Sequence, residues 1–148
     1  MNPTISEILR ANQSFYDAFS SSNLVKMRGV WADTTEVVCI HPGWSPLTGI
    51  DEVMGSWDTI FRAQERFEIS PVGEEVRIAG SMAFVICGES VNDEPATLVA
   101  TNVFYKSEHG WKLLHHHASP VLGEEAYDEL TSDEDKTGGS DPGDPILH

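Results

Sequence analysis

The chain has 148 residues, and 24 acidic against 9 basic side chains give it a formal net charge of -15 at pH 7. A chain of this length forms one domain that folds without disulfides or metal ions. Because no basic stripe interrupts the acidic composition, neither nucleic acid nor an anionic membrane surface is an expected partner.

The negative charge is concentrated at the C-terminal end. Nine acidic residues against Lys136 alone lie within residues 124–148, so this segment carries -8 of the net charge. Its acid, Ser, Gly and Pro composition is typical of a segment that cannot bury enough apolar surface to offset the entropy of ordering. We therefore expect a domain over residues 1–123 and a largely disordered acidic tail over residues 124–148.

Both cysteines, Cys39 and Cys87, lie within apolar, β-branched runs. In that setting a free thiol behaves as a small buried hydrophobe, so we expect both to be reduced. The N-terminus lacks a basic segment followed by an apolar one, and no stretch approaches the roughly 18 apolar residues of a membrane span. These features predict a cytoplasmic protein with no membrane partner, and they leave cytosol and nucleus as alternatives.

The first two-fifths of the chain shows helical spacing in three places. Apolar residues recur every three or four positions over residues 5–21, where Thr4 and Glu7 form a candidate capping box. Residues 24–30 predict a second, short helix. The third helix is expected over residues 50–64, where apolar residues again recur every three or four positions.

The remaining apolar segments predict strands. The β-branched run at residues 36–40 ends at His41-Pro42-Gly43, and a strand is expected to stop at that proline. Four more strands separated by short turns are expected over residues 67–78, 82–91, 96–106 and 111–118. Helices followed by a meander of strands indicate an α+β fold, in which a curved, mainly antiparallel sheet packs on the N-terminal helices.

Three motifs resemble the SnoaL-like branch of the NTF2-like superfamily, which has the ketosteroid isomerase-like fold. They are HPGWSPLTGI before the third helix, ATNVFYK in the penultimate strand, and the closing strand from Trp111 to Pro120. The resemblance covers about residues 5–120. It implies a cone-shaped α+β barrel that is commonly a homodimer through the outer face of the sheet, with a pocket between the sheet and the helices.

The same resemblance implies a protein that binds a small apolar molecule and needs no cofactor. Isomerase, cyclase or dehydratase chemistry by general acid–base catalysis is one expectation. A non-catalytic dimeric interaction scaffold is the alternative, because the fold by itself specifies no reaction.

Comparison with the ketosteroid isomerases places individual residues. His41 stands where those enzymes keep the carboxylate that abstracts a proton, and Phe15 and Asn102 stand where they keep a tyrosine and a protonated aspartate. The phenol is absent at that position unless the neighbouring Tyr16 replaces it. Loss of one oxyanion donor costs roughly 10²- to 10³-fold in rate, so the resemblance disfavours steroid isomerisation.

The three consecutive histidines are the most conspicuous feature of the last strand. Alternation along a strand places His115 and His117 on one face with Trp111, and His116 on the other. With the Trp111 face inward, as the family suggests, His115 and His117 join His41 as the candidate catalytic residues. The alternatives are ligand contact without chemistry and hydrogen-bonded histidines in the pocket wall. No metal site is expected, because no carboxylate adjoins these histidines.

The register of this strand is left open by the sequence. Pairing across the turn at residues 107–110 could set Asn102 opposite His116, and a one-residue register change or a bulge decides which face Asn102 shares. The resemblance favours the face of His115 and His117.

Further candidates line the expected pocket or the expected dimer surface. The candidate ligand-binding residues are Phe15, Tyr16, Trp44, Trp57, Phe61 and Asn102. Helical spacing equally predicts that Trp57 and Phe61 are ordinary core. Glu89 interrupts an apolar strand near its hairpin end. A buried carboxylate there would be a candidate base with a raised pKa, but we favour the alternative that it points outward. One face of the next strand is suited to burial against a second copy of the chain and comprises Thr97, Val99, Thr101, Val103 and Tyr105.

Overall fold

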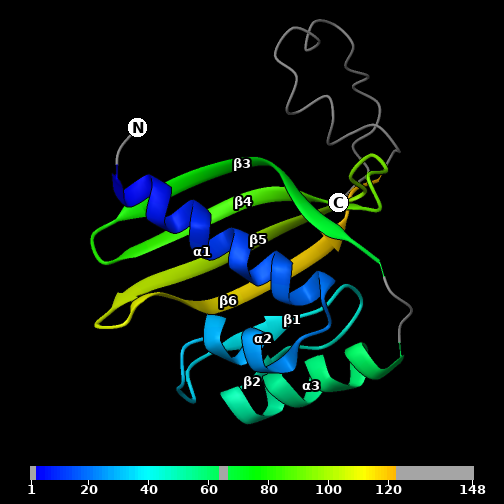
Figure 1. Ribbon diagram of the computed structural model, residues 1–148, viewed down its shortest axis with the longest axis horizontal. Helices are drawn as coiled ribbons and strands as arrows, with labels where there is room; N and C mark the ends of the chain where they lie inside the picture. The colour runs from blue at the N-terminus through cyan, green and yellow to red at the C-terminus, as the bar shows by residue number, and fades with distance from the viewer. Residues whose placement is uncertain (1–2, 64–66, 123–148) are drawn as a thin grey trace, which may run out of the picture.

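The computed structural model describes residues 3–63 and 67–122 (Figure 1), so the segment expected to be a disordered tail lies outside the described residues. The elements in chain order are α1 (Pro3–Ser20), α2 (Leu24–Val30), β1 (Val38–Ile40), β2 (Leu47–Thr48), α3 (Ile50–Ala63), β3 (Ile69–Ala79), β4 (Met82–Val91), β5 (Leu98–Ser107) and β6 (Gly110–Pro120). This order confirms the predicted α+β class. In the part of the chain that the structure describes, no helix is long and apolar enough to cross a membrane.

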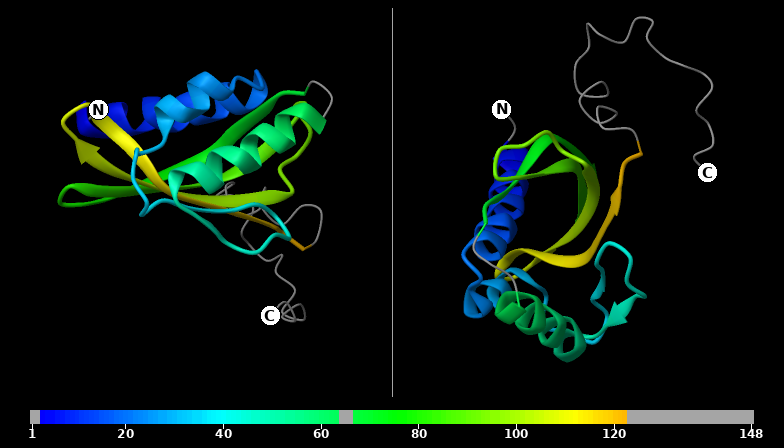
Figure 2. Two further views of the ribbon diagram at one scale, coloured as in Figure 1. Left: turned by 90° about the horizontal axis from the view of Figure 1, so that it is seen from below. Right: turned by 90° about the vertical axis from the view of Figure 1, so that its right-hand side faces the viewer.

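The six strands form one mixed sheet in the order β2-β1-β6-β5-β4-β3. Neighbouring strands are antiparallel except for β1 and β6, which run parallel. The sheet does not close into a barrel, because β2 and β3 remain at its two edges. It curves around α1, and α2 and α3 lie together beside the β1 end of the sheet (Figures 1 and 2).

The first helix presents one face to the concave side of the sheet. Ile8, Asn12, Phe15 and Tyr16 are all fully buried, and they recur at steps of three and four along α1. The helix begins at Pro3, where the fixed proline φ suits a first turn. Thr4 therefore lies inside the helix and is not its N-cap, which corrects the predicted capping box.

The short strand β2 was not predicted from the sequence. It pairs antiparallel with β1 through Val38 and Thr48, and Gly49 follows it with a φ of 89°. That backbone conformation favours glycine and turns the chain directly into α3. A two-residue strand is too short for alternation to reveal.

A β-bulge in β6 decides which way its histidines face. Val103 pairs with His115 and Phe104 with Leu113, so Leu114 is the additional residue on β6. The bulge resets the alternation: Leu113 and His116 are buried, while His117 is exposed on the opposite face. The predicted orientation of His115 and His117 toward the interior is therefore wrong, and His116 takes that place.

Candidate functional site

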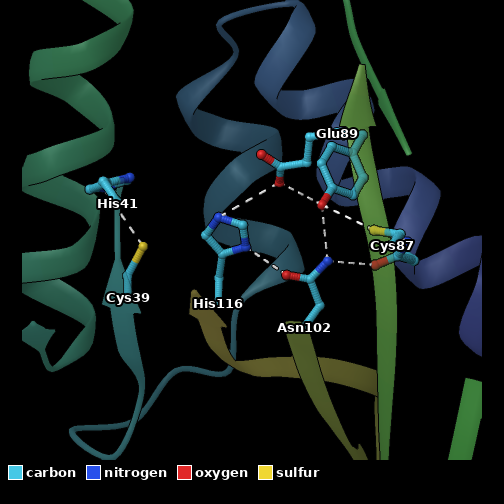
Figure 3. A network of polar contacts seen from close by, with 8 residues as sticks. Cys39, His41, Cys87, Glu89, Asn102 and His116 are labelled. Carbon is cyan, nitrogen blue, oxygen red and sulfur yellow. Dashed lines mark hydrogen bonds and ion pairs between the residues drawn. The ribbon is translucent and has the colours of Figure 1, made fainter. Parts of the chain in front are cut away.

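The core holds a set of buried polar side chains that we call the interior polar cluster. It comprises Asn12 and Tyr16 from α1, Glu89 from β4, Asn102 from β5 and His116 from β6. Figure 3 labels the last three of these. None of the five is more than 2% exposed. Polar groups are buried in this way only when they are hydrogen-bonded, so their partners define the site.

Strand pairing and helical spacing bring these side chains together. Asn102 is the direct partner of His116 across β5 and β6, so both project from the concave face. Tyr16 lies one helical turn after Asn12, and both face the sheet. Glu89 continues the buried alternation of β4, which brings its carboxyl beneath α1.

Hydrogen bonds connect the whole cluster. The Tyr16 hydroxyl donates to Glu89 Oε2 at 2.7 Å and accepts from Asn102 Nδ2 at 3.2 Å. Asn102 Nδ2 also donates to Asn12 Oδ1 at 2.9 Å. His116 Nδ1 lies 2.6 Å from Asn102 Oδ1, and His116 Nε2 lies 4.0 Å from Glu89 Oε2 (Figure 3). The carboxyl and the imidazole therefore face each other, but they are too far apart for a direct hydrogen bond.

Burial controls the protonation states within the cluster. It raises the pKa of the Glu89 carboxyl from its usual 4.5 to about 7, against the opposing effect of the Tyr16 hydrogen bond. It lowers the pKa of His116 to about 3, with smaller contributions from the other histidines. Burial and the nearby Glu89 raise the pKa of the Tyr16 phenol well above 10. At neutral pH the imidazole is neutral, the phenol keeps its proton, and Glu89 is poised between its two forms.

His41 occupies a second buried polar position. Its Nε2 lies 2.9 Å from Ser56 Oγ and 3.7 Å from Cys39 Sγ. Burial lowers the pKa of His41 to about 4, so this imidazole is also neutral at pH 7. Trp57 contacts both histidines, with ring centroids 4.7 Å from His41 and 6.3 Å from His116. One aromatic ring thus lies between His41 and the interior polar cluster.

The remaining candidate ligand-binding residues lie around this tryptophan. Phe15 is fully buried and contacts Trp57 and His116, with centroids 5.7 and 4.8 Å away. Phe61 is half-buried against Trp57. Trp44 is 43% exposed and packs edge-on against His41. Trp57 is fully buried, and its indole N–H has no hydrogen-bond partner.

Two surface hollows lie away from the interior polar cluster. One of about 640 Å³ is bordered by Asp17, Lys26 and Ile69, and one of about 470 Å³ is bordered by Glu7, Ile78 and Trp111. No residue of the cluster lines either hollow. The expected pocket between the sheet and the helices is neither of these two hollows. Within residues 3–63 and 67–122, no group of three or more His, Cys, Asp and Glu side chains is placed to hold a metal ion.

Two members of the cluster, Glu89 and His116, lie on the opposite face from the one predicted from the sequence. We expected Glu89 to point outward because it lies near a hairpin end, but it is 2% exposed and hydrogen-bonded to Tyr16. The signal was present in the sequence, since alternation from Val85 through Cys87 continues to position 89. His116 was assigned to the outer face because the bulge at Leu114 leaves no mark in the sequence.

An open, curved sheet that packs on three helices is the arrangement of the NTF2-like class of α+β domains. The SnoaL-like domain family matches residues 8–123, and the chain belongs to that family. Both findings confirm the resemblance seen in the sequence.

Known proteins that resemble this chain differ in what they are described to do. An NTF2-like protein of Streptomyces avermitilis with a provisional dehydratase assignment is 34% identical, covering 80% of this chain and 96% of that one, with a TM-score of 0.72. A provisionally assigned calcium/calmodulin-dependent protein kinase type II association domain from Thiobacillus denitrificans is 37% identical, covering 76% and 93%, with a TM-score of 0.66. F-box protein SKIP8 of Arabidopsis thaliana is 29% identical over 119 residues, which are 80% of this chain and 52% of SKIP8. The chain thus spans about half the length of that curated relative.

Proposed function

We propose that this protein is an enzyme that binds an uncharged, mainly apolar small molecule inside the curved sheet and transfers a proton on it through Glu89. The observation that carries the proposal is the buried Glu89 carboxyl, held by Tyr16 and with a pKa near 7. A general acid–base group works best when its pKa lies near the working pH, because both of its forms are then accessible.

The energetic cost of the cluster supports a functional role. A buried carboxyl without a cationic partner costs free energy, and an apolar side chain of similar size would fill the space at lower cost. The fully or nearly buried polar and charged side chains of the described residues include no Lys or Arg. Strongly perturbed groups of this kind gather at functional sites, which favours chemistry over a purely structural role.

The side chains around Glu89 define the class of ligand. A carboxylate or phosphate would meet no cation beside Glu89, so the favoured ligand is uncharged. Phe15 and Trp57 provide aromatic surface for an apolar body. The unpartnered Trp57 N–H is a donor for one ligand oxygen. His116 Nε2, 4.0 Å from Glu89, is an acceptor for a ligand hydroxyl.

A single carboxyl suffices for the proposed reaction. Ionised Glu89 takes a proton from a carbon next to a carbonyl group, and the electron pair of the broken C–H bond moves into an enolate. The resulting carboxylic acid then returns the proton, either to another carbon in an isomerisation or to a leaving hydroxyl in a dehydration that releases water. The Tyr16 hydrogen bond holds the carboxyl in place during both steps.

Proton transfer can be measured before the natural substrate is known. We would incubate the protein in D₂O with a panel of uncharged β-hydroxy ketones and β,γ-unsaturated ketones, and follow exchange of the α-protons and turnover by ¹H NMR. Glu89→Gln should lower the exchange rate by about 10²-fold or more. His117→Ala, on the outer face, should leave the rate unchanged. Equal rates in the wild type and in Glu89→Gln would exclude Glu89 as the acid–base group.

A dimeric interaction scaffold remains the alternative function. On the outer face of the sheet, Val103 of β5 pairs with Phe84 of β4 on one side and with His115 of β6 on the other, and all three are half-buried. We propose that a second copy of the chain covers this row, because a contiguous apolar sheet face favours self-association. The Thiobacillus denitrificans protein that is provisionally assigned as an association domain is 37% identical to this chain, which supports a role in assembly. If a variant that disrupts the dimer loses partner binding while Glu89→Gln leaves partner binding unchanged, the scaffold function is favoured.

The proposed location is the cytoplasm. Cys39 and Cys87 are both free and buried, as expected for a protein of a reducing compartment. Localisation of the tagged protein in cells tests this directly.

A further inference from the structure

We propose that Glu74 is a positioning residue that determines which ring nitrogen of His116 carries the proton, through a chain of hydrogen bonds that passes through Asn12 and Asn102. The tautomer follows from geometry alone; its catalytic consequence rests on the function proposed above.

The chain of hydrogen bonds runs from the protein surface to the centre of the site. Asn12 Nδ2 donates to Glu74 Oε2 at 2.7 Å, and Asn102 Nδ2 donates to Asn12 Oδ1 at 2.9 Å. Asn102 Oδ1 then lies 2.6 Å from His116 Nδ1 (Figure 3). Glu74 on β3 is half-buried, while the other three side chains are at most 1% exposed. Four elements that are separate in sequence are thus joined by three successive hydrogen bonds.

Each hydrogen bond fixes the direction of the next one. An ionised carboxylate only accepts, whereas an amide has one donating and one accepting end. Glu74 therefore takes the amino group of Asn12, which leaves the Asn12 oxygen to accept from Asn102. The Asn102 oxygen can then only accept, so His116 must donate to it from Nδ1. Nε2 is left without a proton, with its lone pair facing Glu89.

Two contacts oppose the reversed direction of these hydrogen bonds. Turning both amides would place the Asn12 oxygen 2.7 Å from Glu74 Oε2, which sets two acceptors against each other. It would also remove the donation from Asn102 Nδ2 to the Tyr16 hydroxyl, whose own proton is given to Glu89. Two independent contacts thus select the same tautomer.

The tautomer of His116 determines whether an N–H donor or a lone pair faces Glu89. In the reversed form Nε2–H would face the carboxyl from 4.0 Å and would favour its ionised form. In the observed direction His116 offers a lone pair, so Glu89 gains no second donor and keeps its raised proton affinity. The same lone pair is free to accept a hydrogen bond from a ligand hydroxyl. Glu74 thereby acts on the acid–base group from the surface without touching it.

The tautomer is measurable in the full chain without any ligand. Long-range ¹H–¹⁵N correlation spectra of the ¹⁵N-histidine-labelled protein distinguish Nδ1–H from Nε2–H imidazoles, and the signal that His116→Gln removes identifies His116. We expect Nδ1–H in the wild type. Glu74→Lys replaces an acceptor with a donor, so Asn12 and Asn102 should turn and the His116 signal should change to Nε2–H. Glu74→Gln retains an accepting oxygen and should preserve Nδ1–H.

A matched control lies at the next position. Glu75→Lys makes the same charge change, but Glu75 is exposed and pairs with Arg77, so the tautomer should not change. An Nε2–H tautomer in the wild type, or an unchanged tautomer in folded Glu74→Lys, would overturn the inference. If Glu74→Lys does not fold, the spectra of the wild type and Glu74→Gln decide. A reversed tautomer with unchanged α-proton exchange would support the hydrogen-bond chain and count against the proposed role of His116 in the reaction.

Discussion

The Tyr16 hydroxyl and the Glu89 carboxyl, joined by a 2.7 Å hydrogen bond, connect the first helix to strand β4. This bond stabilises the ionised carboxyl, while burial opposes ionisation more strongly. The balance between the two sets the proton affinity of the site.

Removal of the Tyr16 hydroxyl should therefore raise the pKa of Glu89 above 7. In Tyr16→Phe the buried carboxyl also loses its donor, at a cost of about 1–3 kcal/mol in the free energy of unfolding measured by urea denaturation. Tyr105→Phe is the matched control, because Tyr105 lies half-buried on β5 outside the cluster. Equal losses in the two variants would show that the hydrogen bond does not stabilise the fold.

The raised pKa of Glu89 predicts a specific dependence of stability on pH. Between pH 4.5 and about 7 the folded state binds a proton that the unfolded state has released, so the Glu89 contribution to stability falls as pH rises. A shift of this size corresponds to about 3 kcal/mol at pH 8. Glu89→Gln removes the contribution, so the melting-temperature difference between variant and wild type should move in favour of the variant from pH 4.5 to 8. A constant difference would contradict the raised pKa.

The lowered pKa of His116 predicts that stability depends on pH in the opposite direction in acid. Its pKa is lowered to about 3, so between pH 6.5 and 3 the unfolded state binds a proton that the folded state excludes. Stability is therefore lost as pH falls through this range. His116→Gln should reduce the acid sensitivity and shift the midpoint of acid unfolding to lower pH. The exposed His109 offers the control, since His109→Gln should leave the midpoint in place.

The proposed base role of Glu89 sets the pH profile of catalysis. Only the ionised carboxyl abstracts a proton, so kcat/KM should rise with pH and level off above about 7. In Tyr16→Phe the same profile should shift to higher pH, because the carboxyl has lost its donor. A profile that falls across this range would instead assign Glu89 as the initial acid.

A charge at the centre of the paired row tests self-association through the outer face. Val103 lies between Phe84 and His115 in the paired row, and Val103→Glu places a charge there. Light scattering at micromolar concentration should give a dimer for the wild type and a monomer for the variant. Val25→Glu on α2 is the control, since Val25 is 83% exposed. A monomeric wild type would exclude the proposed dimer.

Local patterns were sufficient to predict most of the fold. The three helices, five of the strands to within a few residues and the α+β class follow from hydrophobic periodicity, which reports the face that each element buries. The short β2 was missed because two residues carry no period. The motifs around His41, Asn102 and Trp111 were likewise enough to indicate the family, and the family match bears this out.

The composition of the site was decided by tertiary structure. The bulge at Leu114 turns His116 inward and His115 and His117 outward, and a bulge depends on how β5 and β6 pair. Glu89 is buried because α1 covers its end of β4 and supplies Tyr16 as a donor from 73 positions away. A sequence pattern reports which face of an element is apolar. Which polar groups meet across that face depends on register and on the packing of distant segments, and here these two decided that Glu89 and His116 face each other.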